Sequence, residues 1–313
     1  MVKVTVLMSV YNTEESFLRE AIESILNQTF KDFEFLIIND GSTNNAETVI
    51  RSYNDSRINY VLNEQNLGLI ASLNKGLALA KGEYIARFDS DDISLPTRLE
   101  KQVEFLDKNP NIVLLGTQYE SFPKKRVSDG LTDPKQIKEN LLTVSNQLGH
   151  PTVMMRTSTV REHNLQYNKD ALHVEDYRLW LDFNEIGKIS NLDEVLLMYR
   201  RHGKSICSNN TIKQNLNVQK IMFEAQAKYF NLNADKALAT VNTLMQGNQV
   251  QTENLKAVLD FVNQVKEKMS QHGFTSEYRL NHQFAKYALK RCRKDIAYIK
   301  AQLKGEFKTY YEK

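Results

Sequence analysis

Short apolar runs alternate with amphipathic segments over the first third of the chain. Residues 3–10 (KVTVLMSV) form an apolar run, whereas residues 16–28 repeat apolar side chains every three or four positions. The first pattern is typical of a buried strand, and the second of a helix with one apolar face. Asn12 and Thr13 lie just before this helix and are candidate caps for its first turn.

The same alternation continues to residue 116. We predict strands at residues 33–40, 57–63, 83–89 and 111–116, and helices from the polar segment 41–45 to residue 50, over 68–80 and over 95–109. Gly82 is expected to stop the helix over 68–80. Strands that alternate with helices of this length indicate a mostly parallel sheet flanked by helices, so the predicted fold class is α/β.

The pattern weakens after Gly116. Residues 117–134 favour a loop, residues 153–155 a short strand, and residues 195–200 a strand with alternating side chains. Helical spacing begins just after Glu175 and Asp176, with Tyr177, Trp180 and Leu181 on the side that we expect to be buried. From about residue 208 the chain favours helices alone, over residues 211–230, 234–246, 252–274 and 278–307. The C-terminal region is therefore expected to be all-helical.

Composition narrows the choice of partners and compartment. The 313 residues include 41 basic and 38 acidic side chains, and a net charge of +3 is too small to indicate nucleic acid as a partner. Cys207 and Cys292 are too few for a disulfide framework, which favours a reducing compartment. The N-terminal apolar run is too short for a signal peptide, and no run approaches the ~18 residues of a membrane span. We expect a soluble cytoplasmic protein.

Candidate chemistry gathers where predicted strands end. Polar clusters follow the first, second and fourth strands, as VYNTEE at residues 10–15, NDGS at residues 39–42 and DSDD at residues 89–92. Sheets of this class bind ligands beyond the carboxyl ends of their strands. The chain has no G-x-G-x-x-G in its first turn and no G-x-x-x-x-G-K-[ST] anywhere, which argues against a dinucleotide or P-loop enzyme.

The third cluster places Asp89, Asp91 and Asp92 within four residues. If the strand continues through Asp89 and Asp91, both side chains point to the same side. Carboxylates in this arrangement suit Mg²⁺ or Mn²⁺, which would also hold a diphosphate. The alternative is a solvated turn whose aspartates cap the next helix. On these three residues alone, both interpretations remain open.

Three segments taken in order resemble a known family: residues 9–43 (SVYN to DGST), 66–92 (NLGL to DSDD) and 173–181 (HVEDYRLWL). They are similar to the inverting nucleotide-sugar glycosyltransferases of family two, which have the A-type fold. The resemblance covers about Val4 to His202 and is greatest to bacterial enzymes that build surface glycans such as lipopolysaccharide and capsule. It implies transfer of a hexose or N-acetylhexosamine from a UDP-sugar to a glycan, glycolipid or glycoprotein acceptor, with Mn²⁺ or Mg²⁺ as cofactor.

The resemblance also implies which residues hold the donor. It places Tyr11 against the uracil ring, Glu14 near the ribose and Asp40 as the acceptor of the uracil N3–H. The further donor contacts that it implies are Val10, Asn12, Asn66, Asn74, Asp89 and Ser90. Without the resemblance, Tyr11 would pass for a surface ring and Asp40 for a turn residue before Gly41.

Metal and catalytic roles are implied in the same way. Asp91 would ligate the ion, with His202 completing its shell. Asp92 would position the donor sugar or an acceptor, or cap the next helix. Asp176 would be the general base that takes the proton of the acceptor hydroxyl, and Glu175 would orient it. Acids in a first helical turn also complement the helix dipole, so a purely structural role for this pair remains open.

Two further features, one histidine and one group of basic residues, each allow two interpretations. His150 could face the acceptor, but a histidine before such a strand is more often structural. Arg200, Arg201 and Lys204 could neutralise phosphate charge or form a solvated loop.

The resemblance divides the chain into a nucleotide-sugar-binding half (residues 1–116), an acceptor and catalytic-base half (117–206) and the helical region (207–313). In the last predicted helix, one apolar stripe comprises Phe284, Ala288, Cys292, Ile296, Ile299 and Leu303. This stripe could lie on the inner face of the plasma membrane, form a homodimer or face the protein's own core. Its small residues and lack of Trp favour the core.

Two other functions compete with glycosyl transfer. One is a catalytically silent sugar-nucleotide-binding module that presents its helices to a partner, against which the presence of Asp91 and Asp176 argues. The other is a nucleotidyltransferase, which would need a glycine-rich basic loop after the first strand. The sequence has VYNTEE there instead.

Overall fold

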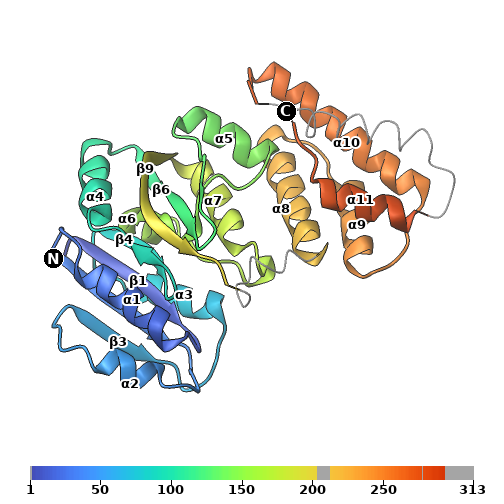
Figure 1. Ribbon diagram of the computed structural model, residues 1–313. Helices are drawn as coiled ribbons and strands as arrows, with labels where there is room; N and C mark the ends of the chain where they lie inside the picture. The colour runs from blue at the N-terminus through green and yellow to red at the C-terminus, as the bar shows by residue number, and fades with distance from the viewer. Residues whose placement is uncertain (1, 203–211, 277, 293–313) are drawn as a thin grey trace. The chain divides into compact units, whose positions relative to one another are not determined.

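The computed structural model describes residues 2–202, 212–276 and 278–292 (Figure 1). It divides into two compact units. The sheet unit comprises Met1–Ile137 and Gln147–Ser208, and the helical unit comprises Lys138–Asn146 and Asn209–Lys313. Cys207 and Lys204, which the sequence analysis singled out, lie outside the described residues.

One mixed sheet carries the sheet unit. Its strands follow the order β3-β2-β1-β4-β8-β6-β9-β5, and β7 pairs with β6 outside this path. Their bounds are β1 Val4–Val10, β2 Phe33–Asn39, β3 Ile58–Leu62, β4 Tyr84–Asp89, β5 Ile93–Ser94, β6 Ile112–Phe122, β7 Arg126–Val127, β8 Met154–Arg156 and β9 Lys188–Arg200. Strands β1 to β4 pair in parallel, whereas β8 is antiparallel to both β4 and β6. The α/β class is confirmed.

Helices cover both faces of this sheet. The helices of the sheet unit are α1 Glu15–Leu26, α2 Ala46–Arg51, α3 Leu69–Leu79, α4 Arg98–Lys108, α6 Thr157–Glu162 and α7 Glu175–Ile186, with short 3-10 turns η1 His150–Thr152 and η2 Lys169–Ala171. Helix α5 Pro134–Thr143 begins in the sheet unit and continues into the helical unit. Apolar residues of α1, α2 and α4 join Val6 and Met8 of β1 in one buried cluster. On the other face α3 packs so tightly that a Cβ at Gly76 would lie 2.1 Å from Leu7 Cδ1. The continuous apolar runs of the sequence thus correspond to strands buried on both sides.

Strand β6 extends six residues into the segment that we expected to be loop. Residues 117–122 are rich in polar side chains, but the structure satisfies them within the sheet unit. Gln118 is buried; its Nε2 donates to the Gly130 carbonyl, and its Oε1 accepts from Ser128 Oγ and the Gly130 N–H. Polarity was therefore a poor guide here, because a distant loop supplies the hydrogen bonds that let a polar strand be buried.

Two predicted helix boundaries are wrong for identifiable reasons. The N-cap of α1 is Glu14, with no capping side chain, because Asn12 Oδ1 instead accepts from the Thr43 N–H at 2.8 Å. Helix α3 ends at Leu79, one residue before the predicted end, and its C-cap is Ala80 rather than Gly82. Glycine is required at position 82 by close packing, since a Cβ there would lie 2.3 Å from the Thr5 nitrogen.

The helical unit contains α8 Ile212–Phe230, α9 Asp235–Met245, α10 Thr252–Gln271 and α11 His282–Arg291. Phe223 at its centre contacts the rings of Phe261 and Phe284 at 5.1 and 6.2 Å. Phe284 and Ala288 are both buried in this cluster, so the core-facing interpretation of their stripe is confirmed for α11. Ile296, Ile299 and Leu303 lie outside the described residues.

The expected helix over residues 278–307 differs at both of its described ends. It begins at His282, because the Asn281 side chain accepts a hydrogen bond from the Phe284 N–H and caps the first turn. It ends before Cys292, which is extended. Within the described ranges, no helix offers an apolar stretch of the length that a bilayer crossing requires.

Candidate active site

The polar loops that follow β1, β2 and β4 meet at one edge of the sheet. β1 lies in parallel register between β2 and β4, with Ser9 opposite Asp89. Across this edge the hydroxyl oxygens of Thr13 and Ser90 lie 2.6 Å apart. Parallel strands thus bring together residues that are far apart in the sequence, at the edge where such sheets bind ligands.

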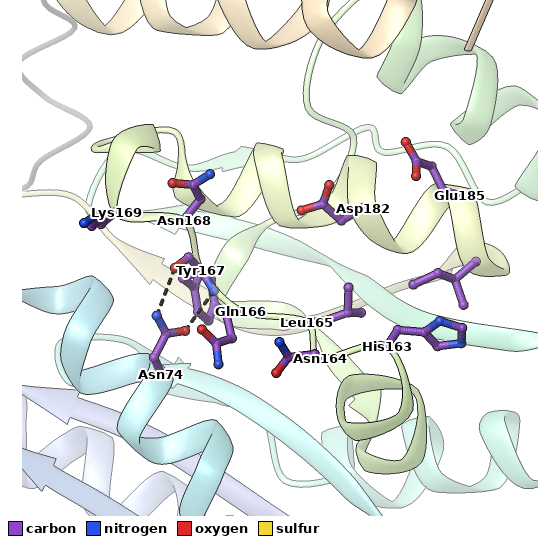
Figure 2. A pocket seen from close by; sticks show the side chains of 11 residues that line it. Asn74, His163, Asn164, Leu165, Gln166, Tyr167, Asn168, Lys169, Asp182 and Glu185 are labelled. Carbon is purple, nitrogen blue, oxygen red and sulfur yellow. Dashed lines mark hydrogen bonds between the residues drawn. The ribbon is translucent and has the colours of Figure 1, made fainter. Parts of the chain in front are cut away.

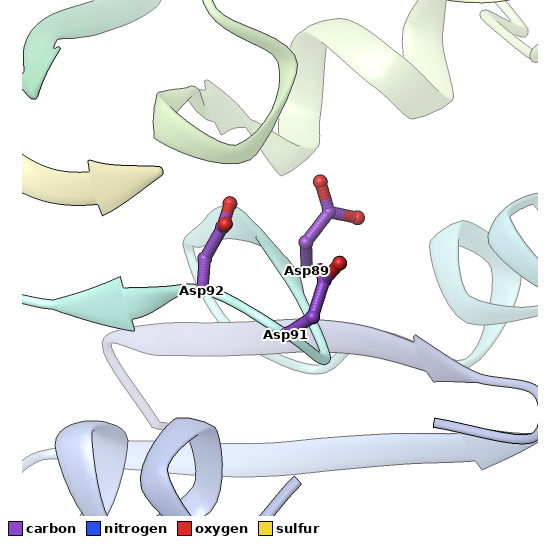
Figure 3. A group of neighbouring side chains, drawn as sticks. All are labelled: Asp89, Asp91 and Asp92. Carbon is purple, nitrogen blue, oxygen red and sulfur yellow. The ribbon is translucent and has the colours of Figure 1, made fainter. Parts of the chain in front are cut away.

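Residues 89–92 form an acidic turn at this edge (Figure 3). Asp89, Asp91 and Asp92 point to the same side of the turn, and one carboxylate oxygen from each lies within 4.8 Å of the others. The expectation that Asp89 and Asp91 share one face of a continuing strand is wrong, because β4 ends at Asp89. The turn, rather than the two-residue period of a strand, brings the carboxylates together.

Asp89 is held by an arginine from its own strand. The Arg87 guanidinium pairs with both Asp89 oxygens, at 2.6 and 2.5 Å, and Arg87 is 3% exposed. Burial nevertheless raises the pKa of Asp89, with Arg87 opposing the change and Asp91 adding to it. Because Arg87 occupies both oxygens, Asp89 is the least available of the three carboxylates to a cation.

A second buried arginine supports the first. The Arg98 guanidinium donates to the Arg87 carbonyl at 2.8 Å and to Gln102 Oε1 at 3.1 Å, and Arg98 is fully buried. Burial and then the charge of Arg87 lower the pKa of Arg98 to about 9. Two arginines therefore share the interior behind three acids, which partly offsets the mutual repulsion of the carboxylates.

Asp92 is fully buried and only half satisfied. Its Oδ1 accepts the Arg200 N–H at 2.8 Å, whereas its Oδ2 has no hydrogen-bond partner among the described residues. Burial, followed by the charges of Asp89 and Asp91, raises the pKa of Asp92 well above its usual range. A buried carboxylate oxygen without a donor, next to two more carboxylates, fits a divalent cation with oxygen ligands. The residues present thus fit the Mg²⁺ or Mn²⁺ that the sequence suggested.

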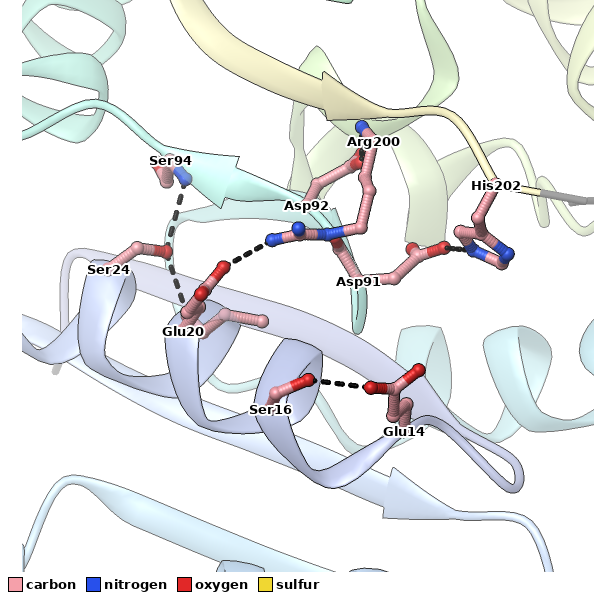
Figure 4. Close-up of polar contacts among 10 residues, drawn as sticks. Glu14, Ser16, Glu20, Ser24, Asp91, Asp92, Ser94, Arg200 and His202 are labelled. Carbon is pink, nitrogen blue, oxygen red and sulfur yellow. Dashed lines mark hydrogen bonds and ion pairs between the residues drawn. The ribbon is translucent and has the colours of Figure 1, made fainter. Parts of the chain in front are cut away.

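Asp91 is tied to the end of β9 (Figure 4). Its Oδ2 lies 2.8 Å from His202 Nε2, so the two metal-ligating residues implied by the family are adjacent. Its carbonyl oxygen accepts from Arg200 Nε at 2.7 Å. The Arg200 guanidinium also pairs with Glu20 on α1. We expected Arg200 either to bind phosphate or to lie in solvent, but its side chain is 11% exposed and occupied by these partners.

The expected nucleoside residues differ in accessibility. Tyr11 is 50% exposed, and Asn66 and Glu14 are also exposed. Glu14 Oε1 accepts from Ser16 Oγ at 2.9 Å. The Val10 side chain is buried in the core, so only its backbone is available to a ligand.

Asp40 is buried and holds the loop that precedes α3. Its two oxygens accept hydrogen bonds from Asn63 Nδ2 at 2.8 Å and from the N–H groups of Leu67 and Gly68 at 2.9 Å. The neighbouring Gly41 has φ of +66°, and a Cβ there would lie 2.5 Å from the Gln65 carbonyl carbon. Asp40 thereby fixes the backbone beside Asn66, with at most one acceptor site to spare.

Asn74 joins α3 to the segment before α7. Its amide donates to the Tyr167 carbonyl at 2.9 Å and accepts from the Tyr167 N–H at 2.8 Å. The Tyr167 hydroxyl lies 2.9 Å from His150 Nε2, and the Trp180 ring meets His150 edge-on. Burial, and then the charge of Arg87, lowers the pKa of His150 well below its usual value, so this histidine is neutral at pH 7.

A pocket of about 670 Å³ lies on this segment (Figure 2). It is lined by Asn74, residues 163–169, Asp182, Glu185 and Ile186. Asn74 is the sole expected site residue in its lining, and the acidic turn contributes nothing to it. This pocket is therefore distinct from the acidic turn at the sheet edge.

Glu175 and Asp176 are the first two residues of α7. The charges of Arg87 and Asp89, which belong to the strand that leads into the acidic turn, also act on the Glu175 carboxyl group. Glu175 is 7% exposed, its Oε2 has no hydrogen-bond partner among the described residues, and burial raises its pKa. Asp176 is partly exposed, and its Oδ1 accepts the Tyr177 N–H at 2.7 Å. Burial raises the pKa of Tyr167, and the charges of Asp176, Glu175 and Asp89 add to the increase while Arg87 opposes it.

Sequence reasoning missed Arg87, Arg98 and Tyr167. A signal existed for Arg87, because it interrupts the apolar strand YIARFD at a position that burial on both faces would reserve for an apolar residue. Arg98 sits on the apolar side of α4, where a charge is equally unexpected. Tyr167 lies in a segment without periodicity, and its sequence carries no comparable signal.

Comparisons with known proteins find related sequences. The model of the family described as Glycosyl transferase family 2 matches residues 5–163. An uncharacterized glycosyltransferase of Haemophilus influenzae is 36% identical over 242 residues, which cover 73% of this chain and 74% of that protein. Escherichia coli WfgD, named as a UDP-Glc:alpha-D-GlcNAc-diphosphoundecaprenol beta-1,3-glucosyltransferase, is 31% identical over 66% of this chain and 80% of its own.

The fold is similar to that of a solved structure. The crystal structure of S. aureus TarS 1-349 in complex with UDP-GlcNAc superposes with a TM-score of 0.63 and 19% sequence identity. The match covers 91% of this chain and 79% of that one. At this level of identity the likeness concerns the fold alone.

Proposed function

Because this chain belongs to glycosyltransferase family 2, we propose that it transfers a hexose or N-acetylhexosamine from a UDP-sugar to a hydroxyl group of a glycan acceptor, with inversion at the anomeric carbon. The name of WfgD includes UDP-Glc, and the TarS structure holds UDP-GlcNAc, so both support a UDP-sugar donor. The observation that carries the proposal is the acidic turn, where a buried oxygen of Asp92 lies without a donor among three clustered carboxylates.

The acidic turn would hold Mn²⁺ or Mg²⁺ together with the donor diphosphate. Asp91 and His202 are the ligands that the family resemblance implies, and their adjacency supports this assignment. Asp92 offers its second oxygen to the same ion or to the donor sugar. When bound, the cation neutralises charge on the departing UDP. Asp89, paired with Arg87, would contact the ribose or water around the ion.

The donor nucleoside would lie beside the loops after β1 and β2. The exposed Tyr11 ring is available to stack on uracil, with Glu14 and Asn66 as polar contacts. Asp40 would accept the uracil N3–H with its remaining acceptor site while its other contacts keep the loop in place. Asn12, Asn74, Ser90 and the Val10 backbone complete the proposed donor site.

Asp176 would act as the general base. In the proposed step the acceptor hydroxyl oxygen attacks the anomeric carbon, its proton passes to the Asp176 carboxylate, and the bond to the diphosphate breaks with its electron pair staying on UDP. Glu175, buried beside this base, would orient it or accept from an acceptor hydroxyl. His150 is held between Tyr167 and Trp180, which supports an indirect role in shaping the acceptor side.

The division of labour along the chain is also proposed. Residues 1–116 would bind the donor, residues 117–206 would supply the acceptor side and the base, and residues 207–313 would form a helical region for membrane association or dimerisation. Because the printed name of WfgD includes a diphosphoundecaprenol-linked sugar, we propose a glycan or glycolipid acceptor in bacterial surface-glycan synthesis.

A panel of UDP-sugars tests the proposal. UDP release is measured for each donor with Mn²⁺, with Mg²⁺ and with EDTA, in the presence of glycan and glycolipid acceptors. We expect one donor to be turned over, only with the metal, and Asp91→Asn to abolish that turnover. Turnover in the presence of EDTA would contradict a role of the cation in the reaction. Binding of UDP without turnover of any donor would instead favour a silent sugar-nucleotide-binding module.

A further inference from the structure

We propose that Arg200 is a positioning residue that orients Asp91 for cation binding by clamping the acidic turn to α1 and to the ends of β6 and β9. The inference rests on the proposed function, because it takes the acidic turn to be the cation site. In this proposal Arg200 does not bind phosphate. It holds other residues of the same chain in place.

The clamp begins with two bonds from Arg200 to the acidic turn. Its backbone N–H donates to Asp92 Oδ1 at 2.8 Å, and its side-chain Nε donates to the Asp91 carbonyl at 2.7 Å. One residue of β9 therefore fixes both the second and the third acid of the turn. Because the first bond uses the backbone, substitution of the side chain removes only the second of these two bonds, the one to Asp91.

Two aromatic rings and one acid keep the guanidinium in place. Arg200 Cζ lies 4.2 Å from the centre of the Phe17 ring on α1 and 4.5 Å from that of Phe122 at the end of β6. Glu20, one turn after Phe17, pairs with the same guanidinium. A planar guanidinium can lie against aromatic rings and donate in two directions at once, whereas a lysine ammonium on its flexible stem cannot reproduce this arrangement.

The Phe17 ring also connects the clamp to His202, the second proposed metal ligand. The His202 ring lies 5.6 Å from the Phe17 ring, and His202 Nε2 lies 2.8 Å from Asp91 Oδ2. Asp91 is thus held at its carbonyl by Arg200 and at its carboxylate by His202, and both partners pack on Phe17. If a cation were bound by Asp91 and His202, Arg200 would still fix the backbone that carries Asp91.

Residues that orient metal ligands typically change metal affinity by 10–100-fold when they are replaced. We therefore expect Arg200→Gln to weaken Mn²⁺ binding to the full chain by about 10–100-fold, and Arg200→Lys to weaken it by a smaller factor. Mn²⁺ affinity is measured by electron paramagnetic resonance of the free ion, first with Mn²⁺ alone and then with UDP. Thermal unfolding is recorded for each variant in parallel.

Arg19→Gln is the matched control. Arg19 also pairs with a glutamate of α1, Glu15, but its side chain is 41% exposed and contacts neither Asp91 nor Asp92. We expect this variant to bind Mn²⁺ with wild-type affinity. If Arg200→Gln lowers affinity and Arg19→Gln does not, loss of a general ion pair on α1 cannot be the cause.

The outcomes separate this proposal from the proposed function. Wild-type Mn²⁺ affinity in folded Arg200→Gln and Arg200→Lys would overturn the clamp alone and leave the metal site standing. Absence of Mn²⁺ binding in the wild-type protein, with and without UDP, would overturn both. If Arg200→Gln does not fold, the Lys variant decides: full affinity there contradicts the need for the guanidinium, and reduced affinity with unchanged unfolding supports it.

Discussion

The centre of the helical unit is apolar, and Phe223 packs there against two other phenylalanines. The edge of the sheet unit that carries the acidic turn instead contains buried charged side chains. Among the described residues, Glu139 is the one buried acid of the helical unit, and one of its oxygens accepts three hydrogen bonds from Thr275 and Ser276. The described part of the sheet unit buries five charged side chains: Asp40, Arg87, Asp92, Arg98 and Glu175.

This difference is the one expected between a region that contributes mainly to stability and a region that is proposed to bind a cation and a diphosphate. Burying an ionised group is costly unless it is paired and fully hydrogen-bonded, and a group left unsatisfied costs about 1–3 kcal/mol. The sheet edge carries such groups where a cation and a diphosphate are proposed to bind. Among the described residues, the helical unit buries one charged side chain, Glu139. Of the residues that the family model matches, only 138–146 belong to this unit. Substitutions in the two regions should therefore change different observables.

The largest expected effect is on the transfer rate. We expect Asp176→Asn to reduce turnover of the preferred UDP-sugar by about 10²–10⁴-fold, because the amide cannot take the acceptor proton. Asp176 is partly exposed, so the unfolding temperature should change little. The measurement is UDP release under saturating donor, with Mn²⁺ affinity as the check that the acidic turn is intact. Full turnover by this variant would contradict the assignment of the base.

The next effect is on stability alone. Phe223→Ala removes a fully buried ring from the helical cluster, and such a change costs about 3–5 kcal/mol. We expect a matching loss in chemical denaturation, with a smaller loss for Phe223→Leu. Mn²⁺ and UDP binding should stay at wild-type values, since all members of this cluster belong to the helical unit. A parallel loss of Mn²⁺ affinity would break the separation between the two regions.

The smallest effect is a pH dependence. Burial raises the pKa of Glu175 above the value of about 4.3 expected in the unfolded chain, so the native state keeps a proton that the unfolded chain has released. The stability linked to this proton is present below the unfolded pKa and is lost as the pH rises through the folded pKa. Glutamine cannot ionise, and Glu175→Gln should therefore gain stability relative to wild type as the pH rises from 4.

Denaturation midpoints measured from pH 4 to pH 8 test this expectation. Glu185→Gln serves as the control, because it removes an exposed carboxylate from the same helix. We expect its difference from wild type to stay flat over this range. A flat difference for Glu175→Gln as well would contradict a raised pKa of Glu175 in the folded protein.

The sequence was informative where periodicity and burial coincide. Strands β1, β2 and β4 were predicted within one or two residues, because they are buried on both faces and read as continuous apolar runs. The short strand predicted at residues 153–155 is also within one residue of β8. The first seven residues of β9 were missed, because they include polar residues such as Asn191, whose amide donates to carbonyl groups of distant loops.

The candidate site was predicted as a set of residue types rather than as a network. The motif located Asp89, Asp91 and Asp176, because acids at strand ends and helix starts leave a local pattern. Arg87 and Asp89 pair within one strand, two residues apart, whereas the contact of Asp91 with Arg200 joins residues 109 apart and depends on tertiary structure that no local pattern encodes. The Asp40 contacts are similar: its partners at residues 63–68 are known only once the loop has folded around it.

The clamp at Arg200 has a consequence for protein synthesis. Asp92 is separated from Arg200 by 108 residues, and at about 5–20 residues per second a ribosome needs roughly 5–20 s to add them. During that interval β1 to β4 can already be paired and Asp89 can pair with Arg87, but the acidic turn lacks Arg200 and His202. A nascent chain halted before residue 200 would thus have its donor-side strands complete while the proposed clamp and one proposed cation ligand were missing.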